Sequence, residues 1–288
     1  MVPNPPTCLL VSVGNTRTRA AGVIAGQMQP STLLVNADEH GAAQPMLDGL
    51  ARLAPASDSV IVLASVNEPV AKQVAEMFRG GAAGAAGRRR VVRLAVPGAG
   101  KGADELEVPI RTELTPPLTV GVDRLLNALA AHSRSGEACV VIDCGTAVTV
   151  DFVDQWGVFR GGCIAPGLGL SLWALHEQTA ALPLVRSAEV KTLPAPPGKT
   201  TPDAMLAGCA AAIRGMVHHL VERYAELHGS YPRVIATGGD APLILQDDDI
   251  VEHIVPDLTL MGLAAAWNGG SPDGRGAGPS AGRARSGP

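Results

Sequence analysis

Two stretches with the same order of residue types decide the fold: LLVSVGNTRTRAAGVI, residues 9–24, and VVIDCGTAVTVDFV, residues 140–153. In each, an apolar run typical of a strand ends at a Gly-Asn-Thr or Gly-Thr turn, and a second such run follows. The first copy predicts a hairpin with strands over 8–13 and 20–24; the second predicts strands over 138–142 and 148–153. This weak internal repeat predicts two similar α/β lobes.

The rest of the chain supplies further elements around this repeat. Short apolar runs predict strands over 59–64, 91–96 and 234–236. Helical patterns are found over 68–78, 125–132, 169–176 and 202–228. We therefore expect an N-terminal lobe over residues 1–118, a C-terminal lobe over 119–268, and a disordered tail over 269–288 that is rich in Gly, Ser, Pro and Arg.

Composition places the chain among globular proteins. It has 288 residues, of which 46% are hydrophobic and 17% charged, and its net charge of −4 gives no electrostatic reason to bind nucleic acid or an anionic membrane. No uninterrupted apolar run reaches the roughly 18 residues of a membrane helix, and the first residues lack the basic segment of a signal peptide. We therefore expect a cytoplasmic protein. Its five cysteines, without a C-x-x-C pair, are expected to be reduced and mostly buried.

The glycine turns are candidate phosphate cradles. Glycine lets the backbone approach a ligand closely, and the exposed N–H groups and threonine hydroxyl can donate to phosphate oxygens. One such turn is more often an ordinary hairpin turn. Here a third turn, Thr237-Gly238-Gly239, also follows an apolar strand. Because ligands of α/β folds bind at strand ends, the three turns together predict a phosphate-binding site.

Two aspartates are the candidate chemical groups. Asp143 ends an apolar strand, where a carboxylate is costly unless it is paired or binds a cation. It is therefore either a cation ligand beside the phosphates or a cap of a helix or turn. Asp123 lies just before a predicted helix and is either an N-cap or a general base that accepts a proton from an attacking hydroxyl.

Taken together, the motifs resemble those of type III pantothenate kinases, the family that also contains the Bvg accessory factor-like proteins. The resemblance covers roughly residues 8–268 and is carried by SVGNTRTR (12–19), GVDR (121–124), DCGTAVTVD (143–151), GGCIAPGLGLSLWAL (161–175), TAALP (179–183), TPDAMLAG (201–208), TGGD (237–240) and PDLTLMGLAAAW (256–267).

The resemblance implies a fold and an activity. The fold would be the α/β, duplicated actin/hexokinase/Hsp70-like (ribonuclease H-like) one, with a cleft between its lobes. The enzyme would transfer the γ-phosphate of ATP to pantothenate, giving 4′-phosphopantothenate in the first step of coenzyme A synthesis. It would need Mg²⁺ and a monovalent cation, K⁺ or NH₄⁺, and it would be a homodimer.

The resemblance also assigns roles by position. Asp123 would be the general base, Asp143 would bind the monovalent cation, and Thr201 would reach pantothenate, in the partner subunit's site. The residues that contact pantothenate would also include Gly121, Val122, Asp123 and Arg124. Those that contact ATP would be Ser12, Val13, Gly14, Asn15, Thr16, Arg17, Thr18, Arg19, Thr146, Thr237, Gly238 and Gly239.

Three positions depart from the family pattern. The first motif usually reads D-x-G-N-T-x-x-K, whereas this chain has Ser12 for the aspartate and Arg19 for the lysine. A substrate-side tyrosine usually precedes GVDR, and here Leu114-Thr115-Pro116-Pro117 stands instead. Ser12 leaves open a catalytically degenerate protein that binds nucleotide or pantothenate for regulation. The missing tyrosine leaves open a kinase that acts on another small alcohol.

Overall fold

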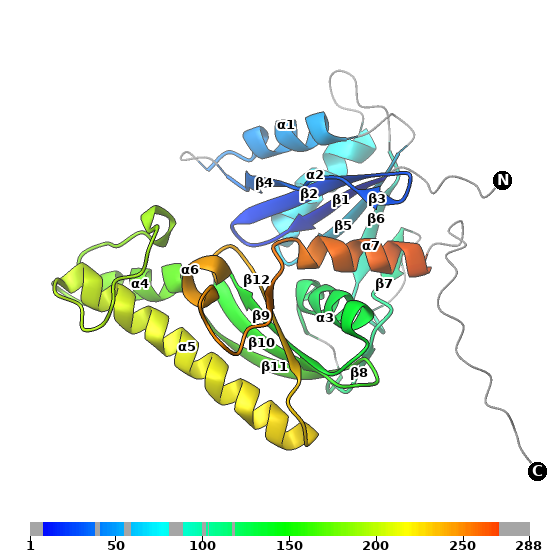
Figure 1. Ribbon diagram of the computed structural model, residues 1–288. Helices are drawn as coiled ribbons and strands as arrows, with labels where there is room; N and C mark the ends of the chain where they lie inside the picture. Colours follow the sequence, from blue (N-terminus) through cyan, green and yellow to red (C-terminus); the bar gives the residue numbers. More distant parts are fainter. Residues whose placement is uncertain are drawn as a thin grey trace, which may run out of the picture.

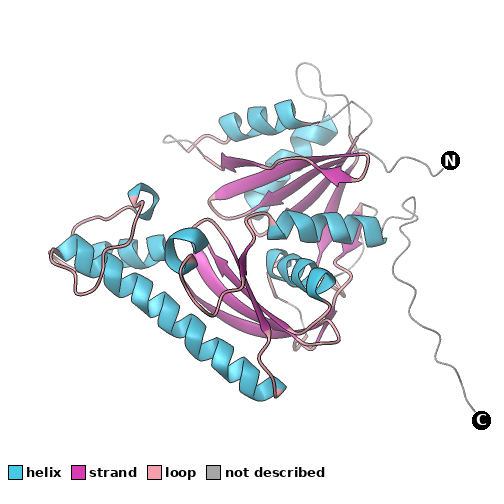
Figure 2. Ribbon diagram, viewed as in Figure 1, coloured by secondary structure: helices cyan, strands magenta, loops and turns pink. Residues whose placement is uncertain are grey.

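The computed structural model describes residues 8–37, 41–54, 59–80, 89–99, 102, 104–116 and 119–270. These form two β-sheets with helices on both faces of each (Figures 1 and 2). Helix α7 runs through Gly270, so the first two residues of the predicted tail are helical, and the rest of that segment lies outside the described residues.

The first sheet is built around the first copy of the repeat. β1 (Cys8–Val13) pairs antiparallel with β2 (Arg17–Ile24) and parallel with β5 (Val60–Ser65). The strand order is β3-β2-β1-β5-β6-β7, with β4 also on β2. The other bounds are β3 (Gln27–Met28), β4 (Thr32–Val35), β6 (Val91–Ala95) and β7 (Glu105–Glu107). The predicted hairpin is confirmed, with its second strand starting three residues earlier than expected.

The second sheet repeats this topology. β9 (Cys139–Cys144) pairs antiparallel with β10 (Ala147–Val153) and parallel with β12 (Arg233–Thr237). The strand order is β13-β12-β9-β10-β11-β8, with β11 over Val158–Pro166, β13 over His253–Ile254 and β8 over Arg111–Thr112. In both sheets, then, the strand before a glycine turn is central. The boundary at residue 118 stays a prediction, and the second sheet takes in β8, which precedes it.

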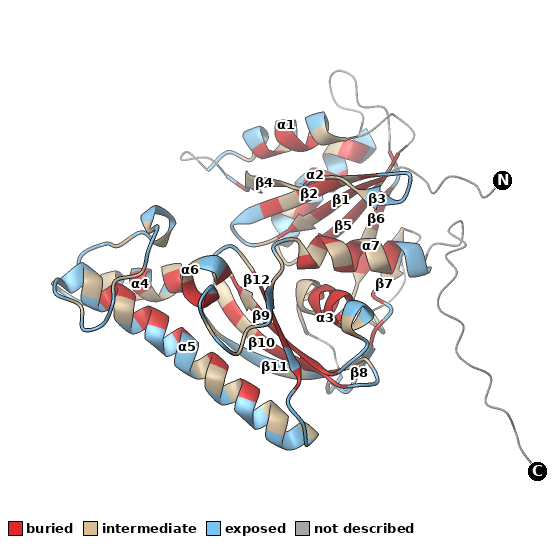
Figure 3. Ribbon diagram, viewed as in Figure 1, coloured by how far each residue is buried: buried red, intermediate tan, exposed pale blue. Residues whose placement is uncertain are grey.

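Helices form three layers around the sheets because strand side chains alternate between faces. α1 (Gln44–Leu53) and α2 (Glu68–Gly80) cover the outer face of the first sheet, where Leu9 and Val11 point. α3 (Val122–Ser135) and α7 (Leu258–Gly270) lie between the sheets, against Leu10 of β1 and Val141 of β9. α4 (Leu168–Glu177), α5 (Thr201–His228) and α6 (Ala241–Leu245) cover the outer face of the second sheet. Figure 3 shows the buried residues in these layers.

Helix α5 has the length and mean hydropathy that a membrane-crossing helix needs, although Arg214 and two histidines interrupt its apolar runs. About a third of its most apolar window is buried, and Ile213, Val217 and Val221 pack into the core of the second sheet. A core helix passes the same test. The packing accounts for the hydropathy of this face of α5.

Candidate active site

The two glycine turns touch each other where the lobes meet. Thr16 Oγ1 lies 3.1 Å from Thr146 Oγ1, although 130 residues separate them in the sequence. The first turn is closed by a hydrogen bond of 2.9 Å from the Gly14 N–H to the Arg17 carbonyl. Both threonines are exposed. The fold therefore brings the two candidate cradles to one side of the molecule.

Neutral side chains donate hydrogen bonds to the carbonyl oxygens of the first turn. The Asn36 amide donates to the Gly14 carbonyl at 2.7 Å and to the Asn15 carbonyl at 3.2 Å, and the Asn67 amide donates to Asn15 at 3.2 Å. The Thr18 hydroxyl in turn donates to Asn36 Oδ1 at 2.7 Å. These bonds occupy carbonyl oxygens of the turn, which would otherwise repel a phosphate.

The segment 12–19 offers fewer side chains to a ligand than its sequence suggests. Val13 and Thr18 are buried, at 1% and 0% exposure, so only their backbone could contact a ligand. Val13 and Thr18 pair directly across the hairpin, so both side chains lie on the face of the first sheet that α1 and α2 cover. Ser12 is partly exposed, and Thr16 and Arg17 are exposed.

The third turn packs directly onto the second. A methyl group on Gly238, which has φ +95°, would lie 2.3 Å from the Cys144 carbonyl, so only glycine fits there. The Asp240 N–H donates to the same carbonyl at 3.0 Å. Thr237 is buried, and a methyl group on Gly239 would lie 3.1 Å from Arg17 Nη1 of the first lobe. All three predicted turns thus meet in one region.

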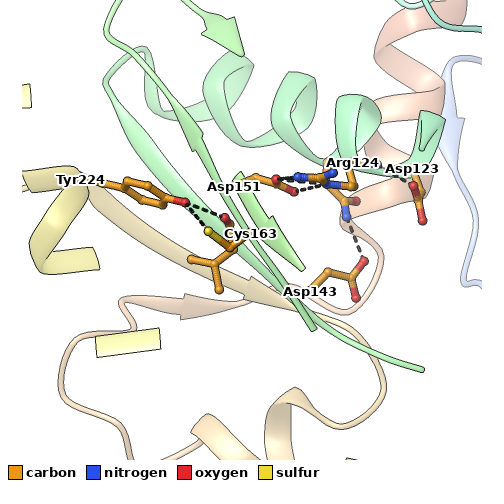
Figure 4. A network of polar contacts seen from close by, with 8 residues as sticks. Asp123, Arg124, Asp143, Asp151, Cys163 and Tyr224 are labelled. Atoms are coloured by element: carbon orange, nitrogen blue, oxygen red, sulfur yellow. Dashed lines mark hydrogen bonds and ion pairs between the residues drawn. The ribbon is translucent and has the colours of Figure 1, made fainter. Parts of the chain in front are cut away.

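Asp143 lies beside these turns at the end of β9, and Figure 4 shows it near Asp123. Its Oδ2 accepts a hydrogen bond of 3.0 Å from the Asn127 amide, whose Oδ1 accepts one of 2.7 Å from Thr259. Burial, and then the charge of Asp123, raise the pKa of Asp143 to about 6. Among the described residues its hydrogen-bond donor is a side-chain amide, which favours the cation-ligand hypothesis over a backbone cap.

Asp123 lies in the first turn of α3, and Gly121 is the N-cap of that helix. The N-cap hypothesis for Asp123 is therefore wrong: the helix begins three residues before its predicted start. Asp123 Oδ1 accepts from the Arg124 N–H at 2.8 Å, and a methyl group on Gly121 would lie 2.4 Å from this oxygen. Burial raises the pKa of Asp123, partly offset by that hydrogen bond. A desolvated carboxylate of this kind is a stronger base than one in water.

Arg19 joins the first lobe to α7. Its Nη1 donates to Asp257 Oδ1 at 2.7 Å and to Ser31 Oγ at 3.3 Å. Its charge also lowers the pKa of Asp143, as the weakest of several effects there. The cations of the first lobe thus face the acids of the second across the site.

Comparison with known proteins fits this geometry. A sequence profile described as "Type III pantothenate kinase" matches residues 8–223, about three quarters of the chain. The chain belongs to the type III pantothenate kinase family. Within this family, the enzyme of that name from Dehalococcoides mccartyi is 33% identical over 266 residues, which are 88% of this chain and 94% of that protein.

Other members of the family match more strongly over a shorter stretch. The type III pantothenate kinase of Rhodospirillum rubrum is 43% identical over 172 residues, and that of Acidiphilium cryptum is 43% identical over 159. The chain covers 66% and 59% of the length of these two relatives, respectively, and the matches take in 60% and 55% of this chain.

Solved structures confirm the predicted fold class. A Baf-family protein from Campylobacter jejuni has a TM-score of 0.52 at 18% identity and covers 91% of this chain and 98% of its own. An archaeal actin homologue has a TM-score of 0.51 at 10% identity, and the match covers 90% of this chain and 98% of that protein. At these identities the likeness establishes the duplicated actin-like fold alone.

The family resemblance also highlights Thr201 and the segment that contains Leu114. Thr201 is exposed in the first turn of α5, at the end of that helix that lies far from α3 in Figure 1. Leu114, in the segment that replaces the family's tyrosine, packs against the core between the sheets, and its Cδ2 would lie 3.4 Å from a methyl group on Gly161. This part of the site is therefore apolar.

Sequence reasoning assigned no role to several residues that build the site. Asn36, Asn67 and Asn127 are lone amides in the sequence, and no motif marks them. Asp151 differs, because an acid in the apolar strand VTVDFV is costly without a partner and is therefore a signal. The structure supplies that partner as Arg124, whose Nε lies 3.1 and 3.0 Å from the two carboxylate oxygens.

Proposed function

We propose that this protein transfers the γ-phosphate of ATP to the primary hydroxyl of pantothenate, giving 4′-phosphopantothenate. One observation carries the proposal: Thr16 and Thr146 of the two turns meet at 3.1 Å, Asp143 lies against the turn glycines Gly145 and Gly238, and Asp123 lies near Asp143. Family membership supplies the substrate pair. Phosphoryl transfer needs positioning, charge neutralisation and a base, and the residues gathered here offer groups suited to each.

The residues divide the reaction between the two lobes. N–H groups of the glycine turns would hold the phosphates, and Arg17 would offset their charge. Asp123 would take the proton of the acceptor hydroxyl as its oxygen bonds to the γ-phosphorus and the bond to the β-phosphate oxygen breaks. The raised pKa of Asp123 suits this role, because a general base works best when its pKa approaches the working pH.

The acids of the site fit the cations that the family uses. Burial, and then the charge of Asp123, raise the pKa of Asp143, and a bound K⁺ or NH₄⁺ would favour the charged carboxylate again. Mg²⁺ bound with the ATP phosphates would neutralise charge on the transferred group. Ser12 offers this ion a hydroxyl instead of a carboxylate, so we expect the nucleotide to hold Mg²⁺ with less help from the protein.

The test is ATP-dependent formation of phosphopantothenate by purified protein, with Mg²⁺ and with or without K⁺. We expect turnover that depends on both ions and that Asp123→Ala abolishes. A wild type that stays inert under every cation condition contradicts the proposal. No observation favours the degenerate alternative, since Asp123, Arg124 and Asp143 are all present and gathered in one site. A panel of other small alcohols, scored by ADP release, tests the alternative acceptor.

The protein is further proposed to be a homodimer. Thr201 lies outside its own chain's site, so a partner subunit would have to supply this residue. Large apolar side chains are also exposed on β11 and α4: Ile164 at 63%, Leu170 at 40% and Trp173 at 50%. Sedimentation of the wild type should give twice the chain mass, and Trp173→Glu should give the monomer. A cytoplasmic location without nucleic-acid or membrane partners remains a prediction.

A further inference from the structure

Three residues surround the side chain of Arg124 and form what we call its socket: Asp151, Phe159 and Gly162. Its Nε and one terminal nitrogen donate to the Asp151 carboxylate, with Nε at 3.1 and 3.0 Å from the two oxygens. Its Cζ lies 5.7 Å from the centre of the Phe159 ring. A methyl group on Gly162, which pairs with Asp151 across the sheet, would lie 2.2 Å from Asp151 Oδ1. The carboxylate therefore has space only because residue 162 is glycine.

This ion pair is more deeply enclosed than the others near the site. The Arg124 side chain is 13% exposed and that of Asp151 is 2% exposed, whereas Arg19 and Asp257 are each about a quarter exposed. Burying an ion pair costs desolvation that the attraction only partly returns, so such a pair is weak evidence for stability. A role in setting the position of a charged group explains its presence better.

The geometry leaves one edge of the guanidinium available. Asp151 accepts from Nε and one terminal nitrogen, and in the described part of the chain no acceptor contacts the other terminal nitrogen, Nη1. Arg124 is also the residue that follows the proposed base, and Figure 4 shows its guanidinium between Asp151 and Asp123. A planar guanidinium fixed along one edge can bind a carboxylate with the other.

We propose that Asp151 is a positioning residue that aims Arg124 at the anionic group of the acceptor. The proposal deepens the kinase function above and rests on it. Pantothenate carries a carboxylate as well as the hydroxyl that reacts. Fixing that carboxylate on Arg124 would place the hydroxyl beside Asp123, one residue earlier on the same turn of α3. On the proposed function, ATP would bind through the glycine turns, so Asp151 should affect the acceptor and not the nucleotide.

The experiment is steady-state kinetics of Asp151→Asn, with each substrate varied in turn. Loss of a charged hydrogen-bond partner should raise the KM for pantothenate at least about tenfold, while the KM for ATP stays within about twofold. In an Arg124→Gln background the same change should add nothing, because Asp151 acts only through Arg124. If Asp151→Asn is too unstable to purify, Asp151→Glu keeps the charge but shifts it against Gly162, and should show a smaller increase of the same kind.

Asp154 provides a matched control. It is also a buried aspartate beyond the same strand, and it pairs with its own arginine, Arg160, at 2.8 Å from Nε. Asp154→Asn should lower Tm without changing the KM for either substrate. If Asp151→Asn raises both KM values equally, or behaves as Asp154→Asn does, the positioning role is wrong while the kinase function stands. A wild type that does not phosphorylate pantothenate overturns the kinase function, and the positioning role with it.

Discussion

The first and second glycine turns occupy matching places in the two lobes but carry opposite chemistry. Ser12 and Asp143 each lie two residues before the turn glycine, in strands that pair in the same way with their neighbours. Arg19 lies opposite Ser12 in the hairpin, and the amides of Asn36 and Asn67 donate to the turn that follows it. Around Asp143 the structure places further carboxylates, Asp123 and Asp151. The repeat thus preserves the backbone arrangement of the turn while the side chains beside it differ, and we propose that the carboxylates of the second lobe supply the base and the cation ligand.

Removing the proposed general base, Asp123 of the second lobe, should have the largest effect. Asp123→Asn should lower kcat by about 10²- to 10⁴-fold, because the substrate hydroxyl loses its proton acceptor. Folding should be unaffected or improved, since the change removes a charge that burial disfavours. Glu68→Gln is the control, because Glu68 is also an acid in the first turn of a helix but lies in the first lobe. Equal kcat values for the two variants would refute the assignment of Asp123.

Removing the carboxylate of Asp143 should have the next largest effect. Asp143→Ala is expected to lower kcat by about 100-fold and to abolish the stimulation by K⁺. The measurement is turnover across a K⁺ titration, with Na⁺ at matched ionic strength as control. If the variant keeps a normal K⁺ response, the cation binds elsewhere and the two lobes differ less than we infer.

The raised pKa of Asp143 also predicts a pH effect on stability. Between the ordinary value of 3.8 and about 6, the folded protein binds a proton that the unfolded chain has released. This group therefore favours folding at low pH, and that contribution is lost as pH rises towards 6, by at most about 3 kcal/mol. Denaturant unfolding of the wild type and of Asp143→Asn should diverge over this range. K⁺ should reduce the loss in the wild type only.

Placing an aspartate at position 12, to match Asp143 of the second lobe, should have a moderate effect on the Mg²⁺ requirement. Ser12→Asp is expected to lower the Mg²⁺ concentration for half-maximal activity by about tenfold, because a carboxylate binds the metal–phosphate complex more strongly than a hydroxyl. A metal titration at fixed ATP measures it. Activity that appears only in the variant would mean that the native chain is degenerate, and an unchanged Mg²⁺ requirement would mean that other groups compensate for Ser12.

Breaking the ion pair between Arg19 and Asp257, which links the two lobes, should have the smallest effect. Arg19 and Asp257 are about a quarter exposed, so their 2.7 Å ion pair should contribute only about 0.5–1 kcal/mol. A double-mutant cycle with Arg19→Gln and Asp257→Asn, followed by urea unfolding, measures this coupling. A coupling several times larger would show that the pair holds the two lobes together, rather than simply spanning them.

Much of this protein could be predicted from the sequence because the information is local. The apolar runs and glycine turns predict both hairpins, and the spacing of apolar residues predicts α2, α4 and α5 within a few residues. The start of α3 was predicted too late, because Gly121 caps the helix by its backbone conformation and offers no side chain to mark the position. That error made Asp123 look like a possible N-cap.

The sequence by itself therefore determined the duplicated fold and the three glycine turns, and it singled out the two acids for which we propose roles. Only the tertiary structure decided which groups meet: Thr16 with Thr146, Asn127 with Thr259, and Arg19 with Asp257. These contacts depend on how the two lobes pack across α3 and α7. The reason is physical: patterns of period 2 and 3.6 set which face of an element is buried, whereas pairing between distant elements depends on the shape of the whole core.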